Sequence, residues 1–186
     1  MTEPEARREF ENFVPPTLFT LNMEVRGEFG PAKPIKKLFR AWGSTAKKGL
    51  RIDYVLTPTP TLEAAGWELG SIGVEVKVGE FAIPYDIRIG RILSQLFDCQ
   101  SAVFTLPDQR PTQLSMIFLF ARPYHRFCQL PASIMMQEGI GLVKGRANWP
   151  ESFALVHGNG NSPILAIKDG LPFYRRPQFG KAAGSR

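Results

Sequence analysis

The sequences LRIDYVL (residues 50–56) and IGVEVKV (residues 72–78) decide the fold that we expect for this chain. Apolar residues alternate with polar ones in both, and most of the apolar residues are β-branched or aromatic, which is typical of β-strands. Because side chains alternate between the two faces of a strand, Glu75 and Lys77 share one face and the valines share the other. We therefore predict two strands whose polar positions include Asp53, Glu75 and Lys77.

Helices and further strands are expected before and after these two strands in the sequence. The predicted helices are a short, frayed one over residues 1–13, ended by Pro15 and Pro16, and amphipathic ones over residues 35–42, 87–104 and about 132–144. The predicted strands are a buried one over residues 115–121 and a hairpin over residues 153–170 with Asn159-Gly160 in its turn. Residues 17–26 fit a strand or a helix start. This order predicts an α/β domain with a central mixed β-sheet flanked by helices.

The length of 186 residues favours one compact domain. We assign it to residues 1–174, with a core over about 24–121, and expect residues 175–186 to be a basic, flexible tail. No run of apolar residues is long enough to span a membrane, and the N-terminus lacks the apolar segment of a secretory signal. Cys99 and Cys128 form no pairing pattern and are interpreted as buried thiols. A cytoplasmic protein is expected.

The positive charge is concentrated in one segment. The chain has a net charge of +6, yet between Phe29 and Ile52 there is no acidic residue and there are seven basic ones. These are Lys33, Lys36, Lys37, Arg40, Lys47, Lys48 and Arg51. Such clustering suits a surface that binds the phosphates of a nucleic acid, because neutralising phosphates supplies most non-specific affinity. A solvated surface segment explains the same charges equally well.

The two strands also carry the chemistry. If they are neighbours, Asp53 and Glu75 can converge on one divalent ion, with the Val76 carbonyl as a third oxygen ligand. Oxygen ligands completed by water and phosphate are how Mg²⁺ is usually held. Lys77 could then position or deprotonate the attacking water, or balance charge in the transition state. The alternative is an exposed edge strand on which Glu75 and Lys77 form a solvated ion pair of little energetic value.

This pattern resembles the PD-(D/E)xK nuclease superfamily, over roughly residues 24–105. The resemblance implies a restriction-endonuclease-like core, with Asp53 and Glu75 as metal ligands and Lys77 as the catalytic lysine. Gln95, in GRILSQLFD on the following helix, matches a glutamine that assists the active site in several branches. Many members add a glutamate from an N-terminal helix; Glu24 or Glu28 are the candidates for that role, although neither lies clearly in a helix.

The function expected from the resemblance is a divalent-metal-dependent nuclease that hydrolyses DNA phosphodiester bonds with a metal-activated water. Mg²⁺ or Mn²⁺ is the expected cofactor, and DNA, including branched or single-stranded DNA, is the expected partner. Many such nucleases form homodimers to cut both strands. Two alternatives remain open: a non-catalytic nucleic-acid-binding or assembly module that keeps the nuclease fold, and an interaction protein with an incidental basic face.

Overall fold

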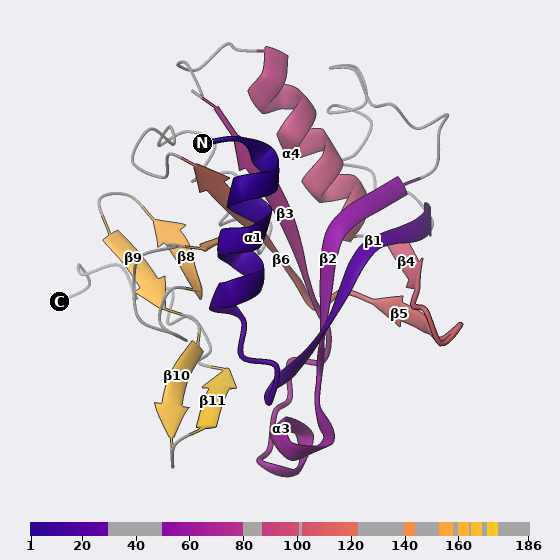
Figure 1. Ribbon diagram of the computed structural model, residues 1–186, viewed down its shortest axis with the longest axis vertical. Coiled ribbons are helices and arrows are strands. Elements are labelled where there is room, and N and C mark those ends of the chain that lie inside the picture. The colour runs from indigo at the N-terminus through magenta and orange to yellow at the C-terminus, as the bar shows by residue number, and fades with distance from the viewer. Residues whose placement is uncertain are drawn as a thin grey trace, which may run out of the picture.

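The computed structural model describes residues 1–29, 50–79, 87–100, 102–122, 140–143, 153–157, 160–163, 165–168 and 171–174 (Figure 1). Its helices are α1 (Glu3–Phe13), α3 (Pro60–Ala64) and α4 (Ile87–Gln100). The strands of the first half are β1 (Phe19–Phe29), β2 (Leu50–Pro58), β3 (Ile72–Val78), β4 (Ala102–Thr105), β5 (Pro111–Gln113) and β6 (Met116–Arg122). Those of the second half are β7 (Ile140–Val143), β8 (Phe153–His157), β9 (Gly160–Pro163), β10 (Leu165–Lys168) and β11 (Leu171–Tyr174).

One mixed sheet organises the fold. Nine strands pair in the order β5-β4-β1-β2-β3-β6-β7-β8-β9, while β10 and β11 form a separate antiparallel pair. The β3–β6 and β6–β7 pairs are parallel, and the other pairs of the large sheet are antiparallel. The α/β class and the mixed sheet are therefore confirmed. β2 and β3, the two strands quoted first, are direct neighbours in the interior of this sheet.

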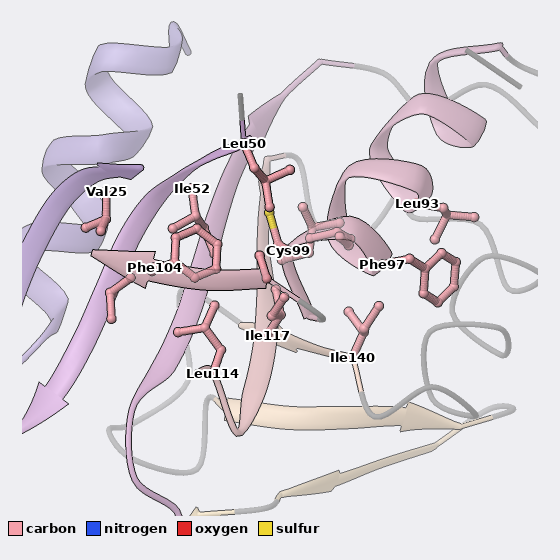
Figure 2. Close-up of a cluster of buried hydrophobic side chains, with 14 of the residues drawn as sticks. Val25, Leu50, Ile52, Leu93, Phe97, Cys99, Phe104, Leu114, Ile117 and Ile140 are labelled. Atoms are coloured by element: carbon pink, nitrogen blue, oxygen red, sulfur yellow. The ribbon is translucent and has the colours of Figure 1, made fainter. Parts of the chain in front are cut away.

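A hydrophobic core lies on each side of the central strands. The first core includes Ile52 of β2, Phe97 of α4 and Ile117 of β6, which are among the side chains labelled in Figure 2. The second core includes Phe10 of α1 and Phe120 of β6, whose rings lie 5.3 Å apart. We call them the α4 core and the α1 core. Because β6 sends alternate side chains into both, the predicted strand buried on both faces is confirmed.

Helix α1 is a regular helix rather than a frayed one. The Thr2 backbone N–H donates to the Glu5 carboxylate at 2.6 Å, which satisfies one of the free donors at the helix start. Ala6 and Phe10 are fully buried, so the helix is held by its apolar face. It ends before Pro15, as predicted.

Several other boundaries were predicted incorrectly. The helix expected over residues 87–104 stops at Gln100, and Ala102–Thr105 forms strand β4, which pairs with β1 and β5. The helix expected to reach residue 144 is wrong at its end, because Ile140–Val143 is strand β7. Of residues 17–26, for which a strand or a helix start was expected, residues 19–26 belong to strand β1 and residues 17 and 18 form a turn.

The predicted hairpin is confirmed for β8 and β9, but Gly160, expected in its turn, lies in β9 and pairs with His157. β10 then pairs with β11 in a second sheet. The helix expected over 35–42, Cys128 and the tail over 175–186 lie outside the described residues. Within the described residues, no helix is long and apolar enough to cross a membrane.

Candidate active site

The site lies where β2 and β3 separate. The two strands are paired from Leu56 and Ile72 as far as Tyr54 and Val74, and the next residues along are Asp53 and Glu75. There the backbone ladder gives way to side-chain bonds. The Val76 N–H donates to Oδ2 of Asp53 at 2.8 Å, and the Asp53 N–H donates to Oε2 of Glu75 at 3.4 Å. Each carboxylate is thus tied to the backbone of the opposite strand.

A local reversal in β1 and β2 positions Asp53 at this point. Ile52 packs in the α4 core and Tyr54 in the α1 core, although residues two apart on a regular strand share a face. In β1, Val25 likewise belongs to the α4 core while Phe19 belongs to the α1 core. Between them Glu24 has a φ of 49°, a left-handed conformation that costs a non-glycine residue about 1–2 kcal/mol. The regular alternation of side chains between the two faces of the sheet is therefore interrupted in both strands, at Glu24 in β1 and at Asp53 in β2.

Both carboxylates are deeply buried. Asp53 is 6% exposed and Glu75 is 2% exposed, on interior strands of the sheet. The alternative of an exposed edge strand with a solvated ion pair is therefore wrong. Burying two acidic side chains this close together is costly unless hydrogen bonds and opposite charges compensate them.

Lys77 and Gln95 compensate Glu75. Nζ of Lys77 lies 2.5 Å from Oε1 of Glu75, and Nε2 of Gln95 donates to the same oxygen at 2.6 Å. Gln95 reaches across from α4, which packs over β2 and β6. The Lys77 side chain keeps 26% of its surface exposed. The four residues predicted to form the site, Asp53, Glu75, Lys77 and Gln95, are thus brought together.

Arg7 of α1 is a member of the site that the sequence did not predict. One of its terminal nitrogens lies 2.5 Å from Oδ1 of Asp53, and the other donates to Glu24 at 3.0 Å. Burial of Arg7 opposes its charge, but the hydrogen bond to Glu24 and the charge of Asp53 raise its pKa overall. The local pattern of α1 gave no signal, because the partner of Arg7 is 46 residues away in the sequence.

The candidates for an additional glutamate are now distinguished. Glu24 reaches the site indirectly, through Arg7, and comes from strand β1 rather than from a helix. Glu28 lies further along β1, in register with Val103 of β4. Glu24 also pairs with Arg51 at 3.3 Å.

Electrostatics single out Glu75. Burial raises its pKa to about 7; the charge of Lys77 opposes this rise and the charge of Asp53 adds to it. The pKa of the buried Cys99 thiol is also raised, first by burial and then by the charge of Glu75. A carboxylate that is so costly to ionise in a folded domain is characteristic of functional sites.

The donor set suits a hard divalent cation. Asp53 and Glu75 supply carboxylate oxygens, and Mg²⁺ is commonly held by one or two carboxylates, with water and substrate phosphate completing its coordination. Among the described residues there is no group of three or more His, Cys, Asp or Glu side chains placed to hold a metal.

The candidate DNA-binding residues are mostly outside the described residues: Lys33, Lys36, Lys37, Arg40, Lys47 and Lys48. Arg51 is described, and it is exposed at the start of β2 beside Glu24. The backbone carbonyl of Arg51 also faces the site, since it accepts a long hydrogen bond of 3.5 Å from the Gln95 side chain. Arg51, the last residue of the basic segment, therefore lies on β2 two residues before Asp53.

Comparison with known proteins gave no match, whether to protein-family models, to curated proteins or to solved structures.

Proposed function

We propose that the protein is a divalent-metal-dependent nuclease that hydrolyses phosphodiester bonds of DNA. The observation that carries this proposal is the cluster formed by Asp53, Glu75, Lys77 and Gln95. Two buried carboxylates lie on neighbouring strands, and one of them, Glu75, accepts hydrogen bonds from Lys77, from Gln95 of the next helix and from the Asp53 N–H. These are the residues that carry the PD-(D/E)xK resemblance, and a restriction-endonuclease-like core over residues 24–121 is part of the same proposal.

Asp53 and Glu75 would hold Mg²⁺ or Mn²⁺. When bound, such an ion supplies Lewis acidity toward the phosphate and the attacking water. Val76 contributes its N–H, which fixes one oxygen of Asp53, and its carbonyl is proposed as a further ligand. Gln95 orients Glu75 through Oε1. Since both carboxylates are positioned by fixed partners, little reorganisation is needed when the ion and the phosphate arrive.

Lys77 is the group best placed to act on the reacting atoms. Its ammonium carries three N–H donors, of which one faces Glu75, so others remain for a phosphate oxygen or for the attacking water. In hydrolysis the water oxygen forms a bond to phosphorus while the bond to the leaving sugar oxygen breaks. A cation beside the phosphate stabilises the negative charge that develops during this exchange.

The decisive experiment compares wild type with Asp53→Asn on labelled DNA, with Mg²⁺ or Mn²⁺ and with excess chelator. We expect cleavage by wild type to require the metal, and Asp53→Asn to lose at least about a hundredfold in rate. Its affinity for DNA should be equal or higher because one repelling charge is removed. Asp108→Asn is a matched control, since Asp108 is exposed and pairs with Arg110 away from the site.

Full activity in chelator, or in Asp53→Asn, would overturn the mechanism. DNA binding without cleavage by wild type would instead favour the non-catalytic binding or assembly module. Reversing the charges of Lys36, Lys37 and Arg40 tests the DNA interface separately. The salt dependence of binding should flatten by about 0.9 in log–log slope per lost phosphate contact on duplex DNA.

A further inference from the structure

Arg7 has an unusual position for a residue of a packing helix. Its guanidinium bridges Asp53 on β2 and Glu24 on β1, and its side chain is 23% exposed. Its Nε is fully buried and has no hydrogen-bond partner among the described residues. The bridge to the two strands is therefore made through the terminal nitrogens, while the inner N–H is left unsatisfied. A purely structural arginine would be expected to satisfy that donor.

The oxygen that Arg7 contacts is the one that a metal would need. Oδ2 of Asp53 is fixed by the Val76 backbone N–H at 2.8 Å. Oδ1 faces the guanidinium of Arg7 at 2.5 Å. A backbone donor cannot leave without breaking the strand pair, whereas a side chain can rotate away. A guanidinium and a divalent cation at the same oxygen repel each other, so occupancy by one weakens binding of the other.

Arg7 has carboxylate partners besides Asp53: Glu3 on the same helix, at 3.2 Å, and Glu24. The Glu24 carboxylate accepts from the other terminal nitrogen of Arg7 at 3.0 Å and is about half exposed. Its left-handed backbone conformation occurs at the point where β1 turns over beside the site. An arginine released from Asp53 would therefore still be held by a carboxylate next to the same two strands.

We propose that Arg7 is a built-in competitor of the divalent metal for Asp53. Without metal, Arg7 bridges Asp53 and Glu24 and neutralises the buried carboxylate. When a divalent cation binds Oδ1 of Asp53, Arg7 keeps Glu24 and leaves Asp53. This inference rests on the proposed metal site, and it makes Arg7 a positioning residue that sets the metal affinity.

The test is calorimetric titration of the full chain with Mn²⁺ in the absence of DNA. Arg7→Gln is expected to bind Mn²⁺ about tenfold or more tightly than wild type, by analogy with the change that a neighbouring charge makes to the proton affinity of a carboxylate. Arg7→Lys, which keeps the positive charge, should stay close to wild type. Arg8→Gln is the matched control, because Arg8 lies on the same helix and is exposed.

Equal or weaker Mn²⁺ binding by Arg7→Gln, with measurable binding by wild type, would overturn the role of Arg7 and leave the nuclease proposal intact. Absence of Mn²⁺ binding in wild type and in every variant would overturn the metal site itself. If Arg7→Gln does not fold, nuclear magnetic resonance of the wild-type protein tests the same inference. The Arg7 guanidinium resonance should shift during a Mg²⁺ titration, and an unchanged resonance at saturating Mg²⁺ would also reject the inference.

Discussion

Replacing Glu75 with glutamine should stabilise the protein above neutral pH. Burial raises the pKa of Glu75 to about 7 against an ordinary value of 4.5, and at about 1.4 kcal/mol per pH unit the difference corresponds to about 3 kcal/mol. Because the folded-state pKa is the higher one, the folded protein binds more protons between these two values. Stability from protonated Glu75 is fully present below pH 4.5 and is lost as the pH rises through 7.

Glutamine resembles the protonated acid and does not titrate. At pH 8 we expect the free energy of unfolding of Glu75→Gln to exceed that of wild type by about 2–3 kcal/mol. The upper value neglects lost hydrogen bonds, and the lower value allows about 1 kcal/mol for loss of the bond from the Asp53 N–H, because the amide has only one acceptor oxygen. At pH 5 the advantage should fall below about 1 kcal/mol.

The assay is urea unfolding followed by tryptophan fluorescence, in the presence of chelator, at pH 5 and pH 8. Glu68→Gln removes an exposed carboxylate and serves as the control, for which a change within about 0.5 kcal/mol is expected at both pH values. A difference between Glu75→Gln and wild type that does not depend on pH would refute the reasoning. A variant less stable than wild type at pH 8 would refute it as well.

Three further outcomes are expected. Lys77→Ala should fold and bind DNA but lose about a hundredfold or more in single-turnover cleavage, and Lys77→Arg should not restore the full rate because a guanidinium does not give up a proton. Gly73→Ala should lower the free energy of unfolding by about 1–3 kcal/mol in thermal denaturation, since its Cβ would lie 2.5 Å from Leu114. Phe10→Ala should cost about 3–5 kcal/mol in urea unfolding, because its ring packs 5.0 Å from that of Tyr54; a loss below 1 kcal/mol would contradict the packing.

The strands that carry the site were predictable because their alternation is strong. The residues predicted for the second strand, 72–78, are those of β3, and the pairing of β2 with β3 places Asp53 beside Glu75. Gln95 was expected from the PD-(D/E)xK resemblance, and it lies on the predicted amphipathic helix after β3, whose apolar face packs on the sheet. For Glu75 and Lys77, local periodicity determines the face on which the residues lie.

Features that depend on distant contacts were not predictable in this way. Ala102–Thr105 follows an amphipathic helix with no break in its apolar character, and it becomes a strand because β1 offers it a partner. Residues 140–143 form a strand alongside β6 for a similar reason. Arg7 joins the site through tertiary packing of α1. The left-handed conformation at Glu24 was not predictable, because such conformations are usually indicated by a glycine and this position is a glutamate.

The reversal of β1 and β2 has a consequence for how the protein opens. Because each of these strands supplies side chains to both cores, neither core can come apart without disturbing the strands that the other needs. Amide hydrogen exchange in the α1 core and the α4 core should therefore report one common opening free energy, rather than two separable units. Asp53 lies at the reversal itself, so the hydrogen bonds around its carboxylate should remain intact until that shared opening occurs.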